Sequence, residues 1–206
     1  MLPKKIVAIG ASDFFGMGDP EEGGFIGRFK RWHEMQDIHN FVYNLGIRGE
    51  TTTQILQRLI PEAIPRKPQL LILTAGSNDI RRKGSKDAPL TTSIERFKKN
   101  ILELIKQGRS LADVVFVSTY PFDETKTTPF SYWNKNNYYF LTDIIAYEKE
   151  VRDICTNENV PFLDIFNKWI DKEYLIWLHE DGQHANPIGH KIIFEDLKNY
   201  LEILYS

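Results

Sequence analysis

One serine, one aspartate and one histidine in this sequence have the types and spacing of a nucleophilic triad. A serine hydroxyl is a weak nucleophile, so it needs a base within hydrogen-bond reach, and that base needs a third group that fixes its tautomer. Asp181 and His184 lie three residues apart in a loop that contains Gly182. One turn there could place the carboxylate against Nδ1–H of His184 and leave Nε2 facing Ser12. The pattern predicts acyl transfer through a covalent intermediate on Ser12.

The same chemistry needs hydrogen-bond donors for the negative charge that develops on the substrate carbonyl oxygen. The candidate donors are the backbone N–H of Ser12, the backbone N–H of Gly49 and the side-chain amide of Asn78. Glycine allows the backbone to approach a substrate closely because it has no Cβ. A neutral amide donates without titrating. We therefore expect these three residues to form an oxyanion hole.

Five short apolar runs predict the strands that position these residues. The runs cover residues 6–9, 41–43, 70–73, 114–117 and 160–163. Their apolar character is continuous rather than alternating, which indicates strands that are buried on both faces. In a parallel sheet, ligands bind at the carboxyl ends of the strands. Ser12, Gly49 and Asn78 all follow such ends.

Segments with helical spacing of apolar residues alternate with these runs. They cover residues 51–60, 93–107, 139–157 and 188–204, and Gly108 is expected to end the second of them. The alternation predicts a parallel sheet with helices on both faces, which is a three-layer α/β/α sandwich. A length of 206 residues predicts a single domain over residues 1–206.

The amino-acid composition excludes some classes of function. The chain has 26 basic and 28 acidic residues, a net charge of −2, so no strong field exists to attract nucleic acid. A single cysteine, Cys155, excludes an intramolecular disulfide, and it is expected to be a buried, inert thiol on a helix. The apolar run near residue 6 is too short for a signal peptide, and no run reaches the roughly 18 residues of a membrane span. We expect a cytoplasmic protein.

Four blocks of sequence, in order, resemble the SGNH (GDSL-type) hydrolases. The blocks are Ser12 after the first strand, N-x-G-x-x-G at 44–49, G-x-N-D at 76–79 and D-x-x-H at 181–184, continued by H-x-N-x-x-G-H at 184–190. The resemblance implies a flavodoxin-like fold with about five parallel strands and an esterase, lipase or acylhydrolase that acts on a small-molecule ester. It implies that Ser12, Gly49, Asn78 and His184 are the four residues for which the SGNH family is named, and that Asp181 completes the catalytic triad with Ser12 and His184. No cofactor and no metal are implied.

One departure from the family pattern motivates an alternative function. Where the family has Gly-Asp-Ser-Leu, this chain has Gly10-Ala11-Ser12-Asp13, so the carboxylate before the serine is missing and one follows it. A ligand-binding module that keeps the fold without efficient turnover is therefore the second hypothesis. A third is a metal-dependent hydrolase that uses His179, His184 and His190, although their spacing does not match the helical H-E-x-x-H arrangement.

Two further features are candidates for substrate contacts. Arg48 adjoins Gly49, and Trp133 belongs to an aromatic stretch at residues 130–140. That stretch is interpreted either as a helix that packs its apolar face or as a wall for the acyl or alcohol group. A basic run, made of Arg81, Arg82, Lys83 and Lys86, is interpreted mainly as a solvated loop, with recognition of an anionic ester, such as a phosphorylated or CoA-linked one, as the alternative.

Overall fold

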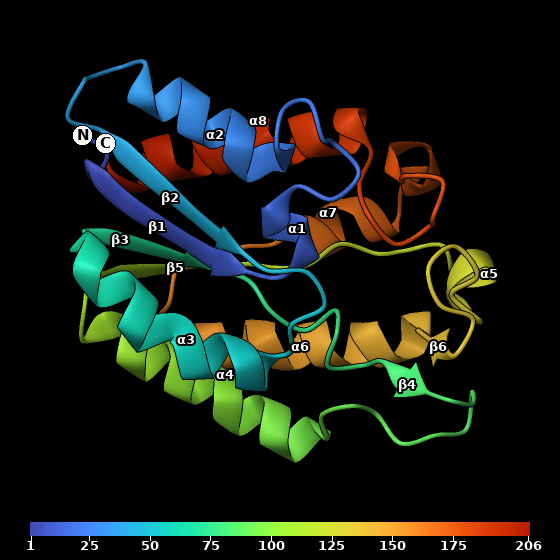
Figure 1. The fold of residues 1–206 in the computed structure, drawn as a ribbon. Coiled ribbons are helices and arrows are strands. Elements are labelled where there is room, and N and C mark those ends of the chain that lie inside the picture. Colours follow the sequence, from blue (N-terminus) through green and yellow to red (C-terminus); the bar gives the residue numbers. More distant parts are fainter.

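A parallel five-stranded sheet lies at the centre of the structure, a computed structural model that describes residues 1–206. The strands are β1 (Lys5–Gly10), β2 (Phe41–Gly46), β3 (Leu70–Leu73), β5 (Asp113–Val117) and β7 (Phe162–Leu163). They lie in the order β2-β1-β3-β5-β7, and every neighbouring pair is parallel. Helices cover both faces (Figure 1). The predicted three-layer α/β/α sandwich, with five parallel strands, is confirmed.

The helices form one layer on each face of the sheet. The first layer holds α1 (Ser12–Phe15), α2 (Gly24–Glu34), α7 (Ile165–Ile170) and α8 (Pro187–Leu204). The second holds α3 (Thr52–Ala63), α4 (Ile94–Arg109) and α6 (Leu141–Asn157). Short 3₁₀ turns, η1 (Ile64–Arg66) and η2 (Tyr174–Trp177), follow α3 and α7. None of these helices combines the length and the hydropathy needed to cross a lipid bilayer.

The two ends of the sheet differ in character. The chain termini lie together at the amino ends of the strands, as Figure 1 shows. The opposite end carries the loops, together with α5 (Glu124–Thr127) and a small antiparallel sheet of β4 (Arg82–Lys83) and β6 (Asn137–Tyr138). The residues that carry the predicted chemistry all come from loops at this second end.

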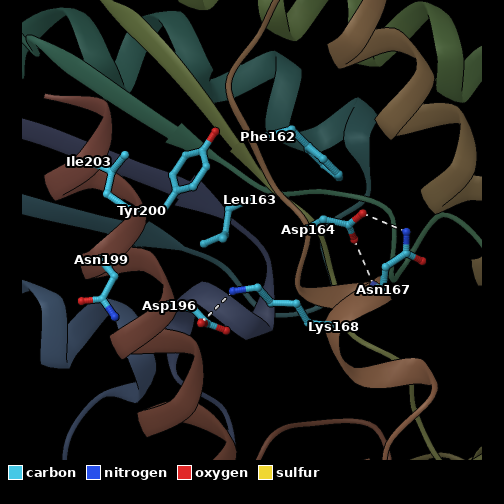
Figure 2. A pocket seen from close by; sticks show the side chains of 9 residues that line it. All are labelled: Phe162, Leu163, Asp164, Asn167, Lys168, Asp196, Asn199, Tyr200 and Ile203. Atoms are coloured by element: carbon cyan, nitrogen blue, oxygen red, sulfur yellow. Dashed lines mark hydrogen bonds and ion pairs between the residues drawn. The ribbon is translucent and has the colours of Figure 1, made fainter.

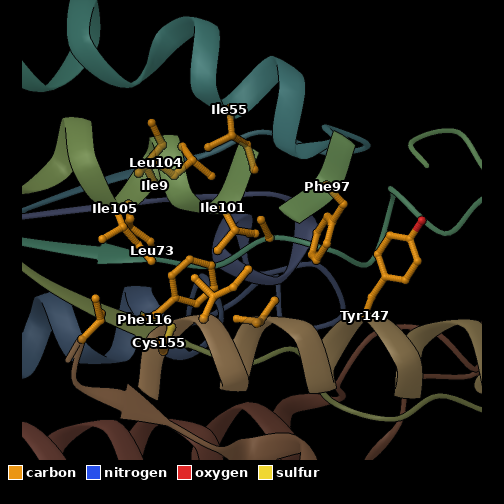
Figure 3. Close-up of a cluster of buried hydrophobic side chains, with 14 of the residues drawn as sticks. Ile9, Ile55, Leu73, Phe97, Ile101, Leu104, Ile105, Phe116, Tyr147 and Cys155 are labelled. Carbon is orange, nitrogen blue, oxygen red and sulfur yellow. The ribbon is translucent and has the colours of Figure 1, made fainter. Parts of the chain in front are cut away.

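Alternate residues of each central strand enter two separate cores. Val7 and Ile9 of β1 belong to a cluster of 25 buried residues against α3, α4 and α6 (Figure 3). Ile6 and Ala8 belong to a cluster of 20 buried residues against α1, α2 and α8. Because both faces are covered, every position of the strand gains from burial, by about 1.5 to 3 kcal/mol for a large aliphatic side chain. This explains the continuous apolar runs.

Two expectations about the elements are wrong. Gly108 does not end α4, which continues to Arg109; its role is instead close packing, because a Cβ there would lie 2.9 Å from Cγ2 of Val114 in β5. Residues 130–140 do not form a helix. They contain turns and β6, and a turn-forming contact, Oδ1 of Asn134 accepting from N–H of Asn136, replaces helical hydrogen bonding.

Cys155 is buried in the first core, as predicted. Burial, together with the nearby Glu148 charge, raises the pKa of its thiol to about 12. A thiol with such a pKa is protonated at neutral pH, and the thiolate is the reactive form. Cys155 is therefore unreactive in the folded protein.

Glu148 of α6 makes the stability of the fold depend on pH. Its side chain is buried, Oε1 accepts from N–H and Oγ1 of Thr119 at 3.0 and 2.7 Å, and Oε2 has no partner. Burial raises the pKa of Glu148 to about 7, although the hydrogen bonds from Thr119 oppose the shift. The folded state therefore holds a proton that the unfolded state releases near pH 4.5.

We expect Glu148→Gln to flatten the fall of stability with rising pH. For an acid whose folded pKa is raised, stability is lost as pH rises from the unfolded pKa to the folded one, here by about 3 kcal/mol between pH 4.5 and 7. Urea denaturation at pH 5 and pH 8 measures the change in the free energy of unfolding. An equal decline in Glu148→Gln and in the unsubstituted protein would contradict the assignment to Glu148.

Candidate active site

The loop ends of the fold bring Ser12, His184 and Asp181 into one hydrogen-bonded row. Ser12 is the first residue of α1, directly after β1, and the other two lie in the loop between η2 and α8. Nε2 of His184 lies 2.9 Å from Oγ of Ser12, and Nδ1 lies 2.7 Å from Oδ2 of Asp181. With Nδ1–H donating to the carboxylate, Nε2 is free to accept the serine proton. This geometry can activate a serine nucleophile.

Asp181 is held as a carboxylate by its surroundings. Its side chain is fully buried, and its Oδ1 accepts from the backbone N–H groups of Gln183 and His184 at 2.8 and 3.0 Å. Burial alone would raise the pKa of Asp181, but the hydrogen bond and charge of His184, together with these N–H donors, lower it well below its usual range. An ionised carboxylate keeps the imidazole in the orientation that faces Ser12.

The oxyanion candidates also lie at this end of the sheet. As the first residue of α1, Ser12 has an N–H without an intrahelical acceptor. Nδ2 of Asn78 is buried and has no hydrogen-bond partner, which is rare for a buried amide and leaves it free to donate to a ligand. Gly49 has φ +80°, and a Cβ there would meet nothing within 4 Å. The backbone angle, rather than crowding, requires glycine at position 49.

Several residues that sequence reasoning overlooked hold these loops in place. Nδ2 of Asn44 donates to the carbonyl of Phe14 at 2.6 Å, which ties the end of β2 to α1. Asp79 accepts from N–H and Oγ1 of Thr52 at 2.9 and 2.6 Å, which ties the loop after β3 to the start of α3. Both belong to the sequence blocks, so their block positions could have flagged them.

Tyr120 also went unnoticed, because nothing in its local sequence marks it. Its hydroxyl accepts from N–H of Ala185 at 3.0 Å, and so anchors the residue after His184. Its ring packs on Trp169, with the ring centroids 5.3 Å apart. The histidine loop is therefore fixed to the sheet by a contact from the segment that follows β5.

The unusual Asp13 lies beside Ser12 rather than at the surface. It is buried, and its Oδ1 lies 3.4 Å from Oγ of Ser12, which is a long and weak hydrogen bond. Burial raises the pKa of Asp13, although the charge of His184 and the contact with Ser12 oppose the shift. The missing carboxylate at position 11 is replaced by a buried alanine. The departure therefore leaves the Ser12–His184 contact in place.

Two cavities meet at Ser12 and His184. A small one, of about 10 Å³, is bounded by Asp13, Ser77 and Thr119 and has room for about one water-sized group. The other is an open groove of about 370 Å³. The larger cavity of about 610 Å³ in Figure 2 lies elsewhere, between β7, α7 and α8, and holds none of the site residues.

The groove contains both candidates for substrate contacts. Arg48 and Trp133 line it together with Ser12, and Cζ of Arg48 lies 4.9 Å from the centre of the Trp133 ring. Nε1 of Trp133 also donates to Oδ2 of Asp181 at 3.3 Å. The aromatic stretch thus contacts Asp181 directly, which its sequence did not indicate.

The basic run divides into residues with different surroundings. Arg82 forms a two-pronged ion pair with Asp143, and Lys83 and Lys86 are exposed. Arg81, in contrast, is partly buried and lines the groove. The interpretation of the whole run as a solvated loop is therefore wrong for Arg81 and Arg82, because β4 and α6 hold this segment against the fold.

His179, His184 and His190 do not converge as a ligand set. His190 uses both ring nitrogens in the fold: Nδ1 accepts from N–H of Phe25 at 3.1 Å, and Nε2 donates to the carbonyl of Met17 at 2.8 Å. Nδ1 of His179 accepts from N–H of Asp181 at 3.2 Å. No group of three or more His, Cys, Asp or Glu side chains is arranged to hold a metal ion.

Solved structures of known proteins share this architecture. A lipase/acylhydrolase from Enterococcus faecalis superposes with a TM-score of 0.74 at 22% identity and covers 94% of this chain and 93% of its own. An acetyl xylan esterase from Geobacillus stearothermophilus superposes with a TM-score of 0.73 at 18% identity and covers 96% and 94%, respectively. At these identities the likeness concerns the fold.

Sequence comparison agrees with the structural likeness. The rice (Oryza sativa subsp. japonica) GDSL esterase/lipase WDL1 is 21% identical over an alignment of 169 residues that covers 77% of this chain and 63% of the rice protein. This chain thus spans less than two thirds of that relative. A model of the GDSL-like Lipase/Acylhydrolase family matches residues 6–197, a range that contains every block at the candidate site. The chain belongs to the GDSL-like lipase/acylhydrolase family.

Proposed function

We propose that this protein is a serine esterase that cleaves carboxylic esters or thioesters through an acyl-enzyme intermediate on Ser12. The observation that carries the proposal is the hydrogen-bonded row from Ser12 through His184 to Asp181, with distances of 2.9 and 2.7 Å. The family and the esterase names of the rice relative and the Geobacillus structure support the same reaction class. The residues present require no cofactor for it.

The reaction follows from the geometry in two halves. Oγ of Ser12 attacks the ester carbonyl carbon while Nε2 of His184 takes its proton. The N–H groups of Ser12 and Gly49 and the amide of Asn78 donate to the oxyanion of the tetrahedral intermediate. The intermediate collapses, the carbon–oxygen bond to the alcohol breaks, and His184 returns the proton to that alcohol. In the second half, His184 takes a proton from water, and the water oxygen attacks the acyl carbon. The bond between that carbon and Oγ of Ser12 then breaks, the acid leaves, and His184 returns the proton to Oγ.

A fluorophosphonate probe tests the proposal directly. Such probes phosphonylate activated serines, so we expect stoichiometric labelling that peptide mapping places on Ser12. An excess of 4-nitrophenyl acetate during the labelling should slow it, because the ester competes with the probe for Ser12. Absence of labelling at every pH between 5 and 9, with no ester hydrolysis, would instead support the ligand-binding module that the Ala11 and Asp13 departure suggests.

Removing the Asn78 amide should slow the reaction without unfolding the protein. We expect Asn78→Ala to lower kcat for 4-nitrophenyl acetate about 10²- to 10³-fold with a small change in KM, because the lost hydrogen bond forms fully only with the oxyanion. Steady-state kinetics measure both constants. Asn136→Ala, in an exposed turn, is the control. A change in KM alone would place Asn78 in ground-state binding rather than in the oxyanion hole.

Trp133 should both help to orient Asp181 and influence which esters are hydrolysed. Trp133→Phe keeps an aromatic wall but removes the donor to Asp181, and we expect kcat to fall about 2- to 10-fold, the value of a modest hydrogen bond. Because Trp133 lines the groove, Trp133→Ala should also alter the order of rates among acetate esters of small and large alcohols, with little change in the melting temperature. Tyr132→Phe controls for loop disturbance. Equal losses for every ester would argue against a wall.

A further inference from the structure

Two arginines face the groove beside Ser12 without any carboxylate partner. Six of the ten arginines in the chain form ion pairs, whereas Arg48 and Arg81 form none. Both line the groove, and no Asp or Glu side chain lines it with them. A cavity with two positive charges and no negative one favours an anionic ligand.

The acidic residues next to these arginines in the sequence are already engaged elsewhere. Glu50 pairs with Arg58, and Asp79 binds Thr52. Glu180, from the neighbouring loop, accepts from the hydroxyl of Tyr132 at 2.7 Å. None of these carboxylates lines the groove. The cavity of Figure 2 differs in this respect, because its Lys168 pairs with Asp196 at 2.8 Å.

Arg81 is the more confined of the two. Its Nε is buried and has no hydrogen-bond acceptor in the structure. Burial raises the pKa of the neighbouring Tyr139 hydroxyl, and the guanidinium of Arg81 opposes that shift, so the charge lies close to the ring. A buried N–H of a charged group without an acceptor costs free energy. An anionic acceptor in the groove would remove that cost.

Arg48 is held by an aromatic ring rather than by burial. It is exposed, but its guanidinium stacks on the ring of Trp133, with Cζ 4.9 Å from the ring centre. Stacking occupies the face of the guanidinium and leaves its N–H edge free for a planar or tetrahedral anion. Because Trp133 contacts Asp181, Arg48 is positioned close to the reacting atoms.

Cavity sizes indicate which part of the substrate carries the charge. The small cavity, of about 10 Å³, has room for one group about the size of the methyl of an acetyl, and the groove, of about 370 Å³, accommodates the larger part of the ester. We propose that the substrate is a short-chain ester whose larger part bears a carboxylate or a phosphate, bound by Arg48 and Arg81. This inference rests on the proposed esterase function and names its substrate class.

Matched esters that differ in charge test the proposal. The alcohol-side series is 4-acetoxybenzoate, its neutral methyl ester and 4-acetoxyphenyl phosphate; the acyl-side pair is mono-4-nitrophenyl glutarate and 4-nitrophenyl butyrate. We expect kcat/KM to be at least 10-fold higher for the anionic alcohol-side esters than for the neutral one, after correction for spontaneous hydrolysis. The two alcohol-side anions distinguish carboxylate from phosphate. A larger preference in the acyl-side pair would overturn the assignment of the charge to the alcohol.

Substitution of each arginine should remove this preference selectively. We expect Arg81→Gln and Arg48→Gln each to lower kcat/KM for the preferred anionic ester about 10- to 100-fold, the factor that corresponds to a hydrogen bond to a charged group, and to lower it by a smaller factor for the neutral ester. Arg96→Gln, an exposed arginine of α4 without an ion pair, is the control and should change neither. Raising the salt concentration should raise KM for the anionic esters alone.

Failure of the anion proposal and failure of the esterase proposal would give different results. Ser12-dependent hydrolysis with equal rates for charged and neutral esters, unchanged by Arg81→Gln and Arg48→Gln, would overturn the anion proposal and leave the esterase in place. Hydrolysis that persists in Ser12→Ala would overturn the esterase proposal itself. Calorimetric titration of Ser12→Ala with 4-acetoxybenzoate measures recognition without turnover, and we expect binding that Arg81→Gln weakens by the same 10- to 100-fold factor.

Discussion

Replacing Ser12 with alanine is expected to lower kcat for 4-nitrophenyl acetate about 10⁴- to 10⁶-fold, the range that follows removal of a triad nucleophile. Without Oγ, no acyl-enzyme forms, and only the oxyanion donors and binding contacts remain. The change removes one oxygen from a small side chain, so the melting temperature should stay close to that of the unsubstituted protein. Stopped-flow or steady-state assays, with calorimetry on the same sample, measure both quantities.

Ser77→Ala is the matched control for this result. Ser77 bounds the same small cavity as Ser12 but forms no hydrogen bond with the His184 ring. It should retain most of the activity. Turnover in Ser12→Ala within 10-fold of the unsubstituted protein would remove Ser12 from the mechanism, and an equal loss in both variants would indicate damage to the cavity rather than loss of a nucleophile.

Asp181→Asn should have the second largest effect, a fall in kcat of about 10⁴-fold. Four donors form hydrogen bonds to this side chain: the ring of His184, the indole of Trp133 and the backbone N–H groups of Gln183 and His184. An amide must turn its own NH₂ toward one of them. If it donates to Nδ1 of His184, the imidazole carries its proton on Nε2 and cannot accept from Ser12.

This variant should also be less stable at neutral pH. The pKa of Asp181 is depressed in the folded state, so its carboxylate contributes stability above the unfolded pKa of about 3.9 and loses it as pH falls. The Asp181→Asn protein would lack that contribution at pH 7, whereas near pH 2 its difference in stability from the unsubstituted protein should be smaller. Urea denaturation at both pH values checks the sign. Asp171→Asn, on an exposed turn, is the control, and near wild-type kcat in Asp181→Asn would contradict the triad assignment.

The absence of a carboxylate before Ser12, in Gly10-Ala11-Ser12-Asp13, does not leave the segment around Ser12 without support. The loop of Ser12 is held instead by contacts from other strands, such as the 2.6 Å bond from Asn44 to the carbonyl of Phe14. Nη2 of Arg58 adds bonds to the carbonyls of Gly10 and Leu45 at 2.9 and 2.7 Å. Ser12 is therefore held in place without a preceding carboxylate.

The sequence by itself was sufficient to predict the fold class and the residues that meet at the candidate site. Continuous apolar runs specify strands buried on both faces, and parallel strands place their following loops at one edge, so Ser12, Gly49 and Asn78 had to lie near each other. The pairing of Asp181 with His184 was also foreseeable, because they lie only three residues apart in one loop. These are local or topological constraints, which residue type and order express directly.

Tertiary structure alone decided what surrounds those residues. The contact of Trp133 with Asp181, the anchoring of the histidine loop by Tyr120, and the separation of Arg81 from Arg82 each depend on how distant segments pack, and no local pattern encodes such contacts. The aromatic stretch, whose apolar content favoured a helix, forms turns and β6 instead. Burial and partner choice come from the whole fold, and they leave Arg48 and Arg81 unpaired beside Ser12.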